Sequence, residues 1–187
     1  MEVSVKKAVS LVVFLVLFLA ACGPTTPPVC DDPGAPSLPP GSYADELEKV
    51  LALTNEARAH DRLCGDVCYH ATAPLARNAK LDTAARKHAE DMAATGVLSH
   101  DTPAGAINYP QGWDPGQRID FEGYSWRRYG ENIARGQPDA ETVVSDWLES
   151  PGHCANIMNP NFEDIGLGYK ADGGGVIYWV QDFGTPR

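Results

Sequence analysis

Apolar positions recur at intervals of three and four residues in three stretches of the chain, and each stripe predicts an amphipathic helix. The first covers about residues 43–58. The second is the clearest, because Asn78 is a candidate N-cap and Gly96 a candidate terminator. The third is expected to end at Ser150, since Pro151 cannot continue a helix.

The residue types after this third helix predict shorter elements. Ser150 and Pro151 fit the N-cap and first position of a further short helix, with the Ser150 hydroxyl as its cap. Alternation then predicts strands at about 165–169 and 176–183, joined as a hairpin by a glycine-rich turn. Residues 101–130, rich in glycine and proline, are expected to form a long irregular loop. Helices followed by a hairpin indicate an α+β fold.

The N-terminus has the pattern of an export signal. Two lysines precede an apolar run that is too short to favour a membrane-spanning helix. The run ends in Ala20, Ala21 and Cys22, which is typical of a bacterial lipobox. We therefore expect residues 1–21 to be a lipoprotein signal peptide and Cys22 to be lipidated, so that the exported protein is anchored to the cell envelope. An ordinary secretory signal is the alternative.

Residues 22–43 are rich in proline, glycine, threonine and serine, and such a composition predicts an extended spacer without a core. This leaves residues 44–187 as one domain. The formal net charge of −10 argues against nucleic acid as a partner and against docking on anionic lipids by charge alone. The membrane is therefore expected to be a partner through the lipid on Cys22.

Four cysteines follow Cys22, namely Cys30, Cys64, Cys68 and Cys154. An exported domain permits disulfides, and an even number of cysteines fits two of them, although three pairings are open. Zinc is a competing interpretation, but Cys64 and Cys68 lack a second close pair of cysteines or histidines. The sequence therefore favours two disulfides.

Six short segments of the chain match the motifs of one protein family and occur in the same order. They are Leu53–Arg58, His88–Ala93, Leu98–His100, Gly130–Ala134, Ser150–Pro160 and Tyr178–Gly184. Their sequences resemble those of the CAP superfamily of cysteine-rich secretory proteins, antigen 5 and pathogenesis-related proteins. The resemblance is closest to the bacterial SCP-like branch of that superfamily. The resemblance implies an α-β-α sandwich with a central antiparallel sheet, whose further strands are expected near residues 98–100 and 130–134.

The resemblance also implies a site. His100, Glu131 and His153 match members of the family's tetrad, in which two histidines and two glutamates line a cleft and the histidines of some members bind a divalent metal. The fourth member is incomplete, because Ser150 stands three residues after a tryptophan where many relatives have glutamate. The neighbouring Glu149 is rotated by about 100° on a helix. Zinc or another divalent metal is therefore expected to bind weakly.

Two further expectations concern cysteine and histidine. The resemblance favours a Cys64–Cys154 disulfide, which leaves Cys30 with Cys68. His88 lies on the apolar stripe of the second helix, so a buried structural histidine with one satisfied nitrogen is the favoured interpretation.

Three functions fit this sequence. The favoured one is a non-enzymatic binding module whose cleft holds a small molecule, lipid, peptide or metal ion. A metal-dependent hydrolase using His100, Glu131 and His153 is the second, although the familiar catalytic motifs, such as His-Glu-x-x-His, are absent. The third is a module that binds another protein while its cleft is vestigial.

Overall fold

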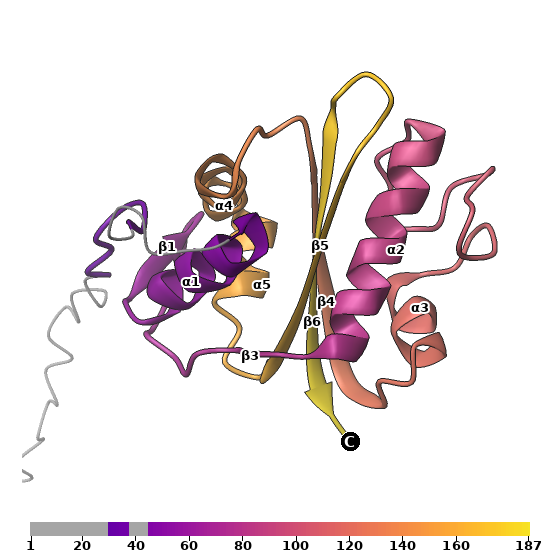
Figure 1. Cartoon of the computed structure of the whole chain (residues 1–187). Helices are drawn as coiled ribbons and strands as arrows, with labels where there is room; N and C mark the ends of the chain where they lie inside the picture. Colours follow the sequence, from indigo (N-terminus) through magenta and orange to yellow (C-terminus); the bar gives the residue numbers. More distant parts are fainter. Residues whose placement is uncertain (1–29, 38–44) are drawn as a thin grey trace, which may run out of the picture.

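The fold is a three-layer sandwich with a sheet between two layers of helices, seen edge-on in Figure 1. The structure is a computed structural model that describes residues 30–37 and 45–187. One face of the sheet carries α1 (Glu46–Arg58), α4 (Ala140–Glu149) and α5 (Pro151–Ile157), and the other carries α2 (Ala79–Thr95) and α3 (Pro115–Phe121). The predicted α+β, α-β-α fold is confirmed.

The central sheet has four strands in the order β3-β5-β6-β4. Their bounds are β3 Ala76–Arg77, β5 Asp164–Ala171, β6 Ile177–Pro186 and β4 Trp126–Arg135. The three long strands pair antiparallel, and β3 runs parallel to β5. The predicted strand at residues 130–134 lies within β4, whereas the strand expected at residues 98–100 is wrong, because those residues form an irregular segment after α2.

Helix α2 lies unusually close to β5, because two glycines face it. A side-chain carbon on Gly166 would come within 2.1 Å of the Leu81 backbone, and one on Gly168 within 2.3 Å of the Arg86 backbone. Any larger residue would therefore push the helix off the sheet. The N-cap predicted at Asn78 is confirmed by its bond from Lys80 N, and Gly96 ends the helix at φ 73°.

Two local predictions need correction, and one hairpin was not predicted. Ser150 occupies the N-cap position of α5, but its side chain makes no capping hydrogen bond. The predicted loop at residues 101–130 contains α3, which has a capping box between Asp114 and Gln117, and ends in the first half of β4. The segment before Ala76 also contains a small hairpin of β1 (Arg62–Cys64) and β2 (Val67–Tyr69), which has no extended alternating pattern.

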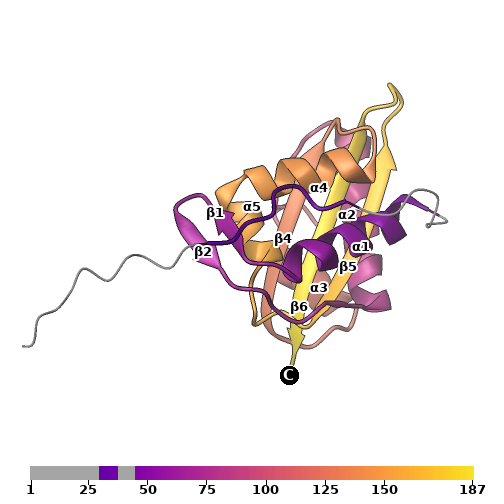
Figure 2. The same cartoon turned by 90° about the vertical axis from the view of Figure 1, so that its left-hand side faces the viewer.

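Residues 30–37, here called the strap, lie against the domain. The Cys30–Cys68 disulfide joins the strap to β2, and Arg62 donates a hydrogen bond of 2.8 Å to Gly34 O. Asp32 Oδ2 accepts from Leu63 N at 2.9 Å. Figure 2 shows the strap crossing the helix layer that contains α4.

Both disulfides have the expected pairing, since the second joins Cys64 to Cys154. The predicted signal peptide, the lipidation position Cys22 and the rest of the spacer lie outside the described residues. Within the described residues, no helix combines the length and the apolar character that crossing a membrane requires.

Candidate functional site

The candidate site lies at β4, one of the two edge strands of the central sheet. Glu131 of β4 is paired with Asp182 of β6. Two positions further along β4, Ile133 is paired with Val180. Those two apolar side chains pack with α2 residues such as Ala89. Because alternate residues of a strand share a face, Glu131 and Asp182 also point towards the layer of α2 and α3.

Glu131 is buried and holds His100 and Arg118 by its two oxygens. His100 Nδ1 lies 2.8 Å from Oε1, and Arg118 donates to Oε2 at 2.6 Å. An ionised carboxylate only accepts hydrogen bonds, so Nδ1 carries the proton and the lone pair of a neutral His100 lies on Nε2. The His100 side chain is 53% exposed, whereas those of Glu131 and Arg118 are 1% exposed. The pair therefore orients an imidazole whose other nitrogen faces outward.

Arg118, from α3, also fixes the segment that carries His100. It donates to the backbone carbonyls of His100 and Trp113, each at 2.8 Å. One guanidinium thus holds both the backbone of His100 and the carboxylate that orients its ring. This bond network gives residues 98–100 a defined position without a strand.

Asp182 and His88 complete the buried surroundings of Glu131. Burial, and after it the neighbouring charge of Glu131, raise the pKa of Asp182 well above its usual value. His88 Nε2 lies 2.9 Å from Ser99 O and 3.9 Å from Glu131 Oε2, and its other nitrogen has no partner. His88 is therefore a buried histidine with one satisfied nitrogen, as predicted, and burial lowers its pKa.

His153 reaches the same edge from the opposite helix layer. It belongs to α5, and Asn132 donates to its carbonyl at 3.1 Å. Asn156, one turn later, donates to Glu131 O at 3.2 Å, so two hydrogen bonds join α5 to β4. The two histidines thus approach β4 from the two faces of the sheet.

The two imidazoles differ in their proton affinity. The hydrogen bond to Glu131 raises the pKa of His100 above its ordinary value, despite partial burial. Burial lowers the pKa of His153, and the charge of His100 lowers it further. Burial alone would raise the pKa of Glu131, but the His100 hydrogen bond and the Arg118 charge outweigh it and lower that pKa.

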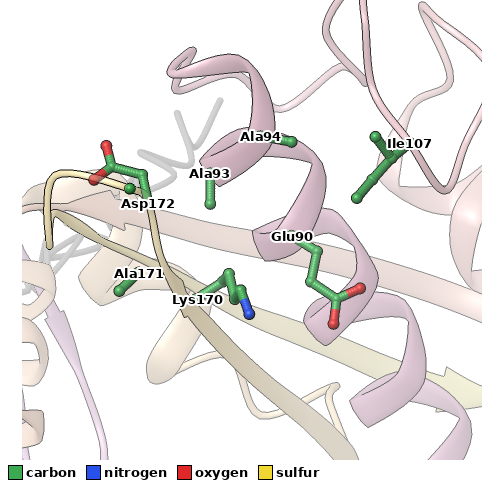
Figure 3. Close-up of a pocket in the computed structure, with 8 residues that line it drawn as sticks. Glu90, Ala93, Ala94, Ile107, Lys170, Ala171 and Asp172 are labelled. Atoms are coloured by element: carbon green, nitrogen blue, oxygen red, sulfur yellow. The ribbon is translucent and has the colours of Figure 1, made fainter.

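Five hollows on the described surface lie away from these residues. One of about 270 Å³ is bordered by Glu90 and Ala94 of α2 and by Lys170 and Asp172 of the β5–β6 hairpin (Figure 3). None of the five described hollows includes His100, Glu131 or His153. The cleft around these residues therefore stays a prediction.

The donor set at β4 does not fit a catalytic zinc site, which needs three protein ligands and a water. Glu131 is engaged on both oxygens, so only two imidazoles are free to hold a metal. In the described part of the chain, three ligating atoms lie within 4.8 Å of one another only in the group of Asp61, Cys68 and His70. The ligands predicted at His100, Glu131 and His153 do not form such a group.

The fold and these motifs agree with a family match. Residues 51–183 match CAP, the cysteine-rich secretory protein family. The chain belongs to the CAP family. This CAP chain is 34% identical over 144 residues to the uncharacterized protein YkwD of Bacillus subtilis, covering 77% of this chain and 49% of that protein. It is 25% identical over 147 residues to the uncharacterized membrane protein YlbC of the same organism, covering 78% and 39%.

Solved CAP structures share the fold. The crystal structure of an extracellular protein containing an SCP domain from Bacillus anthracis superposes with a TM-score of 0.60 at 26% identity, covering 73% of this chain and 39% of that one. This CAP chain spans about half the length, or less, of the curated relatives it matches.

Two members of the site, Arg118 and Asp182, were not identified from the CAP motifs. Arg118 lies in a segment predicted to be a loop, and its only signal is the Asp114–Gln117 capping pattern that starts a helix. Asp182 lies on the inward face of a strand with Tyr178 and Val180, both buried. A carboxyl at an inward position of an apolar strand was the signal that could have found it.

Proposed function

We propose that this chain is an exported, lipid-anchored CAP domain that binds a ligand through His100 and His153 without catalysing a reaction. The observation that carries the proposal is the geometry of Glu131, whose oxygens are both directed to groups behind the site. The carboxylate acts as a support for His100 and is not free to bind a metal or activate water. Two outward imidazoles form a binding surface of low metal affinity.

The ligand is a small molecule, a peptide or a divalent metal held by two nitrogens. A neutral imidazole accepts a hydrogen bond or ligates a metal at Nε2, so one geometry supports each of these ligands. Hydrolysis would need a further ligand to fix the metal and a free base, and the described residues at β4 offer neither. A binding module is therefore preferred to a metal-dependent hydrolase.

Zinc is the probe that tests the two imidazoles. We expect weak binding by calorimetry, lost in both His100→Ala and His153→Ala. Affinity should fall as the pH is lowered, because protons compete for the imidazoles. The fall should begin at a higher pH than for an ordinary histidine, since Glu131 raises the pKa of His100.

His60→Ala is the matched control for the zinc experiment. His60 is exposed and pairs with Glu56, as His100 pairs with Glu131, but lies after α1. Its replacement should leave the zinc affinity unchanged. Equal affinity in wild type and in both site variants would remove His100 and His153 from the ligand site.

Export and anchoring rest on the N-terminal pattern and on the cysteines. Two disulfides fit an oxidising compartment, and one relative of known structure is described as extracellular. The expected result is that the native protein partitions into the detergent phase and that Cys22→Ser makes it soluble or unprocessed. A mature N-terminus well beyond Cys22, without acyl mass, would contradict the lipid anchor.

A further inference from the structure

A second cluster of ligating side chains lies at the base of the β1–β2 hairpin, remote in sequence from the histidines at β4. Asp61 immediately precedes β1, and His70 immediately follows β2. His70 Nδ1 lies 3.1 Å from Asp61 Oδ2. Cys68 lies in β2, two positions before His70. The three ligating atoms lie within 4.8 Å of one another.

Only one of these three residues is unable to bind a metal in the oxidised protein. Cys68 is bonded to Cys30, and zinc binds thiolates, which a disulfide does not provide. Opening this bond would supply two sulfur ligands at once, because the Cα atoms of Cys30 and Cys68 are 5.6 Å apart. Together with one nitrogen and one oxygen, they give the four ligands of a tetrahedral zinc site.

The spacing of the groups suits zinc. With zinc–ligand bonds of about 2.0–2.3 Å, neighbouring ligand atoms in a tetrahedron lie about 3.3–3.8 Å apart. The 3.1 Å between His70 and Asp61 and the 4.8 Å limit on the group differ from this by small side-chain movements. Asp61 keeps its place through its other oxygen, which accepts from Ala71 N at 2.9 Å.

We propose that a dithiol reductant opens the Cys30–Cys68 disulfide and so creates a zinc site at the base of the hairpin. Its ligands are Cys30, Cys68, His70 and Asp61. The reductant gives two electrons and closes its own disulfide, the sulfur–sulfur bond breaks, and two thiols form. Zinc then displaces one proton from each thiol. The strap is thus held by a disulfide in one state and by a metal in the other.

Two features keep the ligands together while the disulfide is open. The strap retains the hydrogen bonds of Asp32 to Leu63 N and of Arg62 to Gly34 O. The hairpin retains the second disulfide, whose Cys64 and Cys154 are 4% and 0% exposed. Cys30 and Cys68 are only partly buried, so a reductant reaches them first.

The test compares oxidised protein with protein treated with a mild dithiol, freed of reductant without air. Alkylation and peptide mapping should find new thiols at Cys30 and Cys68 alone. Competition with a chromophoric chelator should then show one additional zinc per chain, bound at least 100-fold more tightly than any zinc on the oxidised form. His70→Ala and Asp61→Asn should each weaken this zinc at least tenfold in the reduced protein.

The oxidised protein and two matched variants serve as controls. Oxidised protein retains His100, Glu131 and His153, so zinc gained only on reduction does not come from that site. His60→Ala and Asp66→Asn alter an exposed histidine and an exposed acid close by in sequence and should change nothing. The proposal is overturned if thiols appear first at Cys64 and Cys154. It is also overturned if reduction adds no zinc, or if His70→Ala and Asp61→Asn bind that zinc as tightly as wild type.

Discussion

Replacing Arg58 with methionine is expected to lower the free energy of unfolding by about 4 kcal/mol, as at least two charged hydrogen bonds are lost. Arg58 is fully buried, and among residues 30–37 and 45–187 its hydrogen bonds go to backbone carbonyls and not to a carboxylate. It donates to Ala73 O at 2.8 Å, to Ile157 O at 2.6 Å and to Asn159 O at 3.0 Å. One side chain therefore holds α1, the segment before β3 and the end of α5 together.

Methionine fills a similar volume but donates no hydrogen bond, so the carbonyls around Arg58 would be buried without a partner. Ile157 is the last residue of α5, where a positive charge also stabilises the helix dipole. Urea denaturation followed by tryptophan fluorescence measures the change. Arg77→Met, at an exposed ion pair with Asp82, is the matched control and should change stability by less than about 1 kcal/mol. If Arg58→Met lowered the free energy of unfolding no more than Arg77→Met does, the role of Arg58 in holding the three segments together would be refuted.

Replacing Glu131 with glutamine should lower the free energy of unfolding by about 3–5 kcal/mol, because Arg118 would be left as a buried charge without a counter-charge. The pair lies 2.6 Å apart, and both side chains are 1% exposed. The stability that the ionised Glu131 contributes should depend on pH. The folded-state pKa of Glu131 is below its ordinary value, so the stabilisation is complete above that ordinary value and is lost as the pH falls through the folded-state pKa.

A double-mutant cycle separates the pair from its surroundings. Arg118→Met removes the buried charge, so Glu131→Gln should cost clearly less stability in that background than in wild type. Equilibrium denaturation of the four proteins gives the coupling. Additive losses would mean that the two side chains contribute independently, in which case Arg118 is not the group that holds Glu131 in place.

The sequence predicted those elements whose signals are local and repeated. The helices that became α1, α2 and α4 have long apolar stripes, and α2 also has Asn78 and Gly96 at its ends. Helix α3 has seven residues and depends on Asp114 and Gln117 rather than on a stripe. The hairpin of β1 and β2 has three residues in each strand, which is too short for alternation to be recognised.

The sequence identified the histidines and the glutamate of the candidate site but not the arginine that holds them in position. His100, Glu131 and His153 were identified by resemblance, and the structure brings His100 and Glu131 into contact. Arg118 contacts residues 13 to 18 positions away in sequence, and such contacts leave no periodic pattern. The position of His100 was therefore ascribed to a strand, whereas side-chain hydrogen bonds determine it.

The attachment of the strap limits how far the domain can stand from a lipid on Cys22. With Cys22 lipidated as proposed, only the eight steps from Cys22 to Cys30 separate the lipid from a residue bonded to the domain. At about 3.6 Å per step, those residues span at most about 29 Å. If the strap were free, the first helix cap, Asp45, would be 23 steps from the lipid and could reach about 80 Å.

A short tether confines the domain to a thin shell above the bilayer and raises its local concentration towards partners in the same membrane. A tether nearly three times longer would dilute those encounters and admit partners that stand farther from the surface. With Cys22 as the anchor, the Cys30–Cys68 bond would therefore set the distance from the membrane within which this domain meets a partner.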